Sequence, residues 1–304
     1  MTSLFHKRGF LPVILLLVLV SLSCSLSAPA TQEASAQIPK VKASDTSQPP
    51  AVIATNTPEQ PTNTPEPTQE ITPIEAVSPQ ADFGGSTFSY EPQIASSVAG
   101  EEVPAVETGQ GAPWEIQPAT TKFSFDGYPV ADSFTAPEIL IFPVKDFESM
   151  SDVASKTIED LRQVIAVHPQ PVSIKTLPFL PTWNAAQIMH SKVAYFPFEN
   201  GQGVRYLTQY GQGISPINNK YLFYTYQGLT SDGKYYVSAI LPVTNAILPP
   251  DDSTIPGGDM QAFANNYLNY IADMQNKLDA QPEDAFIPSL TMLDNMIKSM
   301  AINK

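Results

Sequence analysis

The segment from Val193 to Val243 constrains the fold more than any other part of this chain. It reads VAYFPFENGQGVRYLTQYGQGISPINNKYLFYTYQGLTSDGKYYVSAILPV and is the densest run of aromatic and β-branched residues in the sequence. Polar stretches interrupt it at 199–203, where Gly201 and Gly203 suit positions with positive φ, and at 231–234, where Asp-Gly is a strong hairpin signal. The pattern predicts four strands in two consecutive hairpins.

Apolar periodicity predicts the elements that surround these hairpins. Strands are expected at 122–130 and 138–144, and helices near 149–168, 259–282 and 288–302, because apolar residues recur there at strand or helical spacing. Asp259 is expected to cap the second of these helices. The sequence therefore predicts an α+β domain with a largely antiparallel sheet of about six strands, covered by helices.

The element order, with a closing segment LTMLDNMIKSM, resembles that of the PsbP-like α/β sandwich found in several exported lipoproteins. The resemblance covers residues 120–304 and rests on the order of the elements, since no diagnostic motif accompanies it. It implies a sandwich fold and assigns no site residue.

The N-terminus has the features of an export signal. Lys7 and Arg8 precede an apolar run from Phe10 to Leu22 that is short for a membrane span. The following Val-Ser-Leu-Ser-Cys resembles the lipobox of bacterial lipoproteins, which implies a signal peptide over 1–24 and a lipid on Cys24. The alternatives are a secreted protein cleaved beyond Ala28 and an uncleaved anchor.

Residues 25–115 are rich in Pro, Thr, Ser and Glu, and Thr-Asn-Thr-Pro occurs in them twice. Such a tract buries too little apolar surface to offset its ordering entropy, so it predicts a disordered linker. The short apolar stretch at Phe83–Tyr90 could form a docking strand, but Gly84-Gly85 argues against much order there. One globular domain is then expected over 116–304.

Composition limits the class of protein. The chain has 304 residues, one cysteine and a formal net charge of −14. Because the cysteine lies in the leader, the folded part has none for an internal disulfide. Twelve acidic and two basic residues fall within 29–118, so most of the negative excess lies in the linker. No basic patch appears in the sequence, which argues against nucleic-acid binding.

The hairpins and the connector before them supply candidate ligand-binding residues. Tyrosine combines an apolar ring with a polar tip, and polar neighbours accompany the tyrosines here, so a glycan or peptide surface is one reading. The favoured reading is that the rings pack across strands, that Trp183 covers the core and that His190 is a partly buried structural histidine. The candidates are Trp183, His190, Arg205, Tyr206, Gln209, Tyr210, Asn218 and Asn219, with Tyr224 and Tyr226 beside them.

No catalytic motif stands out in the sequence. It contains no nucleophile elbow, zinc-protease motif or dinucleotide loop. The aspartates at 251, 252 and 259 match no calcium-loop spacing. A glycosidase carboxylate pair is found by geometry and stays open, with Glu138, Glu199 and Asp232 as the strand-associated acids.

These observations favour a non-enzymatic, extracytoplasmic domain tethered to the cell surface by its lipid, with a glycan or protein ligand and no cofactor, metal or nucleic acid. Two alternatives stay open: an extracytoplasmic hydrolase acting on glycan or cell-wall material, and an accessory subunit of an envelope assembly.

Overall fold

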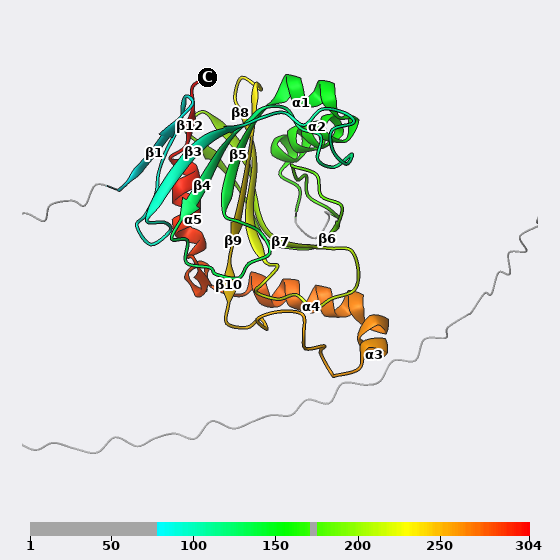
Figure 1. Cartoon of the computed structure of the whole chain (residues 1–304). Coiled ribbons are helices and arrows are strands. Elements are labelled where there is room, and N and C mark those ends of the chain that lie inside the picture. Colours follow the sequence, from blue (N-terminus) through cyan, green and yellow to red (C-terminus); the bar gives the residue numbers. More distant parts are fainter. Residues whose placement is uncertain (1–77, 171–174) are drawn as a thin grey trace, which may run out of the picture. The chain divides into compact units, whose positions relative to one another are not determined.

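The structure is a computed structural model that describes residues 78–170 and 175–304. Cys24, the rest of the leader and the linker up to residue 77 lie outside the described residues. The described residues belong to one compact unit, whose centre is a seven-stranded sheet in the order β3-β4-β5-β9-β8-β7-β6 (Figure 1). All neighbouring strands in this sheet are antiparallel. The α+β class and the largely antiparallel sheet are thereby confirmed.

The six expected strands form. They are β4 (Thr120–Asp126), β5 (Glu138–Pro143), β6 (Ala186–Phe198), β7 (Gly201–Gly211), β8 (Phe223–Thr230) and β9 (Tyr235–Pro242). Strands β6 and β7 form the first predicted hairpin, and β8 and β9 form the second.

Helices cover both faces of the sheet. Helices α1 (Val144–Met150) and α2 (Asp152–Val167) lie on one side, and α5 (Leu290–Lys298) lies on the other (Figure 1). Helix α4 (Tyr267–Asp279) packs along β6. Because side chains alternate along a strand, Tyr206 joins the core under α2 and Leu207 joins the core under α5. Two apolar cores therefore share one sheet.

The folded unit begins earlier than predicted. Strands β1 (Gln80–Phe83), β2 (Ser86–Ser89) and β3 (Ser97–Val103) fall within the segment assigned to the linker. Gly84 and Gly85 occupy the β1–β2 turn with φ of 55° and 73°, so they permit the hairpin that they were expected to prevent. The boundary expected at residue 116 is therefore too late, because the fold already includes Gln80, and β3 adds the seventh strand.

The C-terminal residues pair with the N-terminal hairpin of β1 and β2. The short strand β12 (Ala301–Ile302) pairs with β2. A second short pair joins β10 (Thr244–Asn245) to β11 (Phe286–Ile287), which follows the 3-10 turn η2 (Glu283–Ala285).

Two helix predictions need correction. The segment expected as one helix from 149 is divided at Ser151, whose extended backbone and side chain cap α2 through the amide of Ala154. Helix α3 (Met260–Asn265) and α4 are likewise separated, at Asn266, with Asp259 capping α3 as predicted.

Gly201 and Gly203 do not take the positive φ expected of them. Both lie in β7, where Gly203 faces Gly228 across the ladder. A Cβ atom on Gly203 would stand 2.7 Å from Cζ of Tyr226. These glycines therefore make room for a buried ring.

No helix in the described ranges, 78–170 and 175–304, is long and apolar enough to cross a membrane.

Candidate functional site

An aromatic cleft opens where β6 begins and β7 ends. Its volume is about 690 Å³. We call this cavity and its lining residues the aromatic cleft. Five rings line it: Trp114, Phe134, Trp183, Tyr210 and Tyr221. The loop 211–215, together with Asn184, Gln209 and Asp252, supplies the polar groups of the cleft.

Trp183 is placed by the connector that precedes β6. The backbone amides of Leu177 and Leu180 donate to the side-chain oxygens of Gln187 and Gln227, at 2.9 and 3.1 Å. These bonds hold the connector against the sheet, and the indole of Trp183 then packs on Tyr210 at 5.2 Å between ring centroids. The floor of the cleft is therefore anchored in the core beneath α2.

The opposite wall comes from two loops. The amide of Phe134 donates to the carbonyl of Lys220 at 2.8 Å, and its ring lies 5.3 Å from that of Tyr221. The Thr182 hydroxyl donates to the carbonyl of Trp114 at 3.0 Å, which ties the Trp114 loop to the connector. The exposed fractions are 66% for Phe134 and 40% for Trp114, which is unusual for large apolar rings and marks a surface suited to a ligand.

The polar groups of the cleft differ in how free they are. Gln209 is buried and serves the fold, since its amide donates to the Pro216 carbonyl at 3.2 Å and its oxygen accepts from the Asn218 amide at 3.1 Å. Asn184, Gln212 and Asp252 are exposed at the rim, where the Gln212 amide donates to the Asn184 carbonyl at 2.6 Å. The cleft thus offers ring faces within and hydrogen-bonding groups at its edge.

The predicted polar-aromatic surface does not form as one surface. Tyr206 is completely buried and its phenol donates to the Pro178 carbonyl at 2.8 Å. Tyr224 and Tyr226 are also fully buried, which matches the reading that these rings pack in the core. Only Trp183, Gln209 and Tyr210 among the candidates reach the aromatic cleft.

The other candidates lie elsewhere. Asn218 is buried and organises the loop after β7 by accepting from the amides of Lys220 and Tyr221. Asn219 donates to the carbonyls of Asn245 and Leu248. His190 and Arg205 line a separate cavity beside α4. Sequence alternation alone could not assign these residues to different places.

Sequence reasoning missed Trp114, Phe134 and Tyr221 as site residues. Trp114 lay in the segment taken for linker, and Phe134 lies in a loop between two strands. The available signal was a large ring near a proline in a polar segment: Trp114 directly follows Pro113, and Phe134 precedes Pro137 by three residues.

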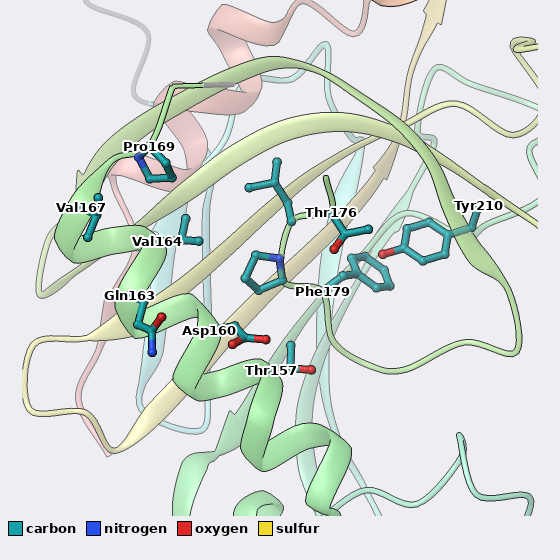
Figure 2. A pocket seen from close by; sticks show the side chains of 11 residues that line it. Thr157, Asp160, Gln163, Val164, Val167, Pro169, Thr176, Phe179 and Tyr210 are labelled. Atoms are coloured by element: carbon teal, nitrogen blue, oxygen red, sulfur yellow. The ribbon is translucent and has the colours of Figure 1, made fainter. Parts of the chain in front are cut away.

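A second groove lies between α2 and residues 176–179 (Figure 2). Thr157, Asp160 and Gln163 line it from α2, and Phe179 and Tyr210 line its other side. Among the described residues that line it, Asp160 alone is charged, and its carboxylate is paired with Lys156 at 2.6 Å. The described lining therefore offers a ligand one carboxylate, which is already in a surface ion pair.

The catalytic and metal candidates do not converge. Among the described residues, no group of three His, Cys, Asp or Glu side chains could hold a metal ion. Asp251 accepts from the Ser253 amide, and Asp259 caps α3. Asp252 is the single carboxylate among the residues that line the aromatic cleft, and the three strand-associated acids, Glu138, Glu199 and Asp232, do not line it.

Comparison of the chain with family models, curated proteins and solved structures finds no match.

Proposed function

We propose that this chain is a non-enzymatic, extracytoplasmic binding domain, tethered to the cell surface through Cys24, that holds a glycan in the aromatic cleft. The observation that carries the proposal is the gathering of exposed rings. Both tryptophans of the chain, Trp114 and Trp183, line the same cleft together with the exposed Phe134.

The chemistry of the cleft fits a sugar chain. Sugar rings present apolar C–H faces that pack on aromatic rings, and hydroxyl groups that bond to amides and carboxylates. Trp183 and Tyr210 supply the first kind of contact, and the rim side chains of Asn184, Gln212 and Asp252 supply the second.

The proposal of a binding role rather than hydrolysis rests on the carboxylates. Glycosidases use a pair of carboxyl groups about 5–10 Å apart on either side of the scissile bond. Asp252 has no carboxylate partner among the residues that line the aromatic cleft. This lining therefore supports binding of an intact glycan rather than its hydrolysis.

Binding is tested with the full chain and soluble oligosaccharides of cellulose, chitin and mannan. Because both tryptophans line the cleft, intrinsic fluorescence titration reports occupancy without a label. We expect saturable binding of at least one of these glycans, and a loss of about tenfold or more in affinity for Trp183→Ala, as for truncation of a central aromatic contact.

Leu268→Ala is the matched control, since Leu268 is 84% exposed and lies outside the cleft. It should bind as the parent chain does. Equal weakening by Leu268→Ala, or saturable binding of proline-rich peptides and of no glycan, would reject the glycan proposal. Release of shorter sugars from the bound glycan would instead favour a hydrolase.

The tether rests on the leader, where a lipobox-like sequence ends at Cys24. Intact mass of the protein from the membrane fraction of its host should fit cleavage before Cys24 plus acyl chains. A protein recovered from the medium and cleaved beyond Ala28 would be secreted, and the tether would be rejected.

A further inference from the structure

The aromatic cleft adjoins a further hollow, of about 680 Å³, which we call the helix-side hollow. Three residues line this hollow and do not line the cleft: Tyr267 of α4, and Ala186 and Ile188 of β6. The remaining lining residues of the hollow, within 183–185 and 211–214, also line the cleft. The two hollows therefore meet over these two segments of chain.

The shared segments are held together. Ala186 pairs with Gly211 where β6 and β7 meet, and next to this pair the Gln212 amide donates to the Asn184 carbonyl at 2.6 Å. A Cβ atom on Gly213 would meet no heavy atom within 4 Å, so the space at this loop is open. The cleft and the helix-side hollow thus share a fixed and uncovered surface.

Helix α4 adds an aromatic ring to this surface. The Tyr267 phenol donates to the Ser215 carbonyl at 3.0 Å, and the Ile217 amide donates to the Tyr270 phenol at 2.9 Å. The ring of Tyr267 also packs edge-on against Phe263, at 5.5 Å between centroids. These contacts tie α4 to the loop after β7 and fix the partly exposed Tyr267 in the lining of the hollow.

The lining of the helix-side hollow repeats the chemistry of the cleft. Trp183 and Tyr267 supply rings, and Ile214, which is 44% exposed, adds apolar surface. Asn184 and Gln212 supply amide groups. Apolar surface for C–H faces and amides for hydroxyl groups are the features that support a glycan in the cleft, and they continue here.

The charge of the lining narrows the class of glycan. Among the described residues that line either hollow, Asp252 alone is charged. Lys220 does not line them, and its Nζ lies 5.8 Å from the centroid of the Tyr221 ring. An acidic sugar would gain no ion pair from the lining and would be repelled by Asp252, because like charges brought together lower affinity. An uncharged sugar loses nothing by this.

We propose that the two hollows form one extended site for an uncharged glycan chain, with some sugar units in the aromatic cleft and further units over Tyr267. This inference rests on the proposed function, since it assigns a length and a charge to the glycan of the cleft. Each hollow falls within the range of about 300–1,000 Å³ that holds a drug-sized ligand. A disaccharide is therefore a ligand for one hollow, and a longer chain is needed to occupy both.

The test is calorimetric titration of the full chain with the disaccharide and the hexasaccharide of cellulose, chitin and mannan. For at least one of these glycans, the hexasaccharide should bind at least about tenfold more tightly than the disaccharide. The reason is that contacts in the helix-side hollow then form within a ligand that the cleft already holds.

Tyr267→Ala should weaken binding of the hexasaccharide by about tenfold and leave the affinity for the disaccharide unchanged. Trp183→Ala, at a residue that lines both hollows, should weaken both. Tyr267→Phe keeps the ring and removes the bond to Ser215, so it should bind both lengths as the parent chain does. Equal weakening by the two Tyr267 variants would overturn the contact between this ring and the sugar.

Leu268→Ala is the matched control next to Tyr267, because Leu268 lies outside both hollows. It should leave the affinity for both lengths unchanged. The charge is tested with the same hexasaccharide oxidised at C6, which carries a carboxylate on each unit and should bind at least about tenfold more weakly. Equal binding of the oxidised chain would overturn the assignment of an uncharged glycan.

The two proposals fail in different ways. Equal affinity for the disaccharide and the hexasaccharide, with no effect of Tyr267→Ala, would overturn the extended site and leave glycan binding in the cleft intact. Absence of binding at either length would reject the proposed function and this inference together.

Discussion

Nη2 of Arg205 lies 3.0 Å from Oδ2 of Asp294, and this contact joins strand β7 to helix α5 inside the core. The other carboxylate oxygen of Asp294 accepts from the Tyr224 phenol, also at 3.0 Å. In Asp294→Ala the guanidinium would remain buried, with Glu283 at 3.5 Å as its nearest carboxylate. We expect the free energy of unfolding, measured in urea, to fall by about 3–5 kcal/mol.

A double variant separates the charge effect from the loss of packing. Arg205→Met combined with Asp294→Leu removes both charges and fills the space with apolar side chains. Such replacements of a buried ion pair are often close to neutral, so the double variant should be more stable than Asp294→Ala. If Asp294→Ala and the double variant unfold at the same urea concentration, the unpaired charge of Arg205 is not the cause of the lost stability.

The Gly203–Gly228 pair makes room for the ring of Tyr226, whose phenol donates to the Phe196 carbonyl at 2.8 Å. A methyl group at position 203 would meet Cζ of Tyr226 at 2.7 Å and the backbone of Gln227 more closely still. Because the backbone cannot move aside freely, Gly203→Ala should lower stability by about 1–3 kcal/mol in thermal or urea unfolding.

Gly213→Ala is the control for this substitution, since a Cβ there would meet no heavy atom within 4 Å. Its effect should stay within about 0.5 kcal/mol. Equal effects at the two glycines would show that the contacts of position 203 with Tyr226 and Gln227 do not decide the result.

Asp232 closes the turn between β8 and β9. The Thr230 hydroxyl donates to it at 2.7 Å and the Lys234 amide at 3.1 Å, and these bonds lower the pKa of Asp232 to about 2. The folded state therefore binds the proton more weakly than the unfolded state. The contribution of Asp232 to stability is complete above its unfolded pKa of about 3.9 and is lost as the pH falls toward 2.

Carbon-detected NMR titration of the Asp232 carboxyl measures this directly. Denaturant unfolding of Asp232→Asn should differ from that of the parent chain at pH 5 and converge with it as the pH approaches about 2. A carboxyl that titrates at the ordinary aspartate value would contradict the assigned hydrogen bonds.

Phe88 anchors the part of the chain that the sequence assigned to a linker. It is 1% exposed, and its ring centroid lies 5.0 Å from that of Phe123 and 6.1 Å from that of Phe125. Truncation of a buried phenylalanine leaves a cavity, so Phe88→Ala should lower stability by about 3–5 kcal/mol. Val167→Ala, at a side chain 72% exposed, should have little effect. If Phe88→Ala left the free energy of unfolding unchanged, residue 88 would belong to a linker, as the sequence indicated.

The predictable parts of this fold were those specified by local chemistry. Asp232-Gly233 fixes the second hairpin through a turn, and Asp259 caps α3 through bonds to amides two and three residues along the chain. Such contacts span a few residues, so a sequence window contains all of their partners.

The parts that could not be predicted depend on distant partners. Strand β2 finds β12 more than 200 residues away, and Trp114 reaches the cleft through Thr182. The same holds for the candidate site residues. Arg205 and Tyr206 are neighbours in sequence, but Arg205 lines the cavity beside α4 and Tyr206 enters the core under α2, because adjacent side chains of a strand point to opposite faces.

Single-tryptophan variants locate a ligand within the aromatic cleft. Trp183→Phe leaves Trp114, which is 40% exposed, and Trp114→Phe leaves Trp183, which packs on Tyr210 and on Phe223 at 5.4 Å. Acrylamide should therefore quench Trp114 more strongly than Trp183 in the free chain. A glycan that lies along the cleft covers both rings, so saturation with the glycan should reduce quenching in both variants. Protection of Trp114 alone would place the ligand on the outer loop and leave the floor formed by Trp183 and Tyr210 without a role in binding.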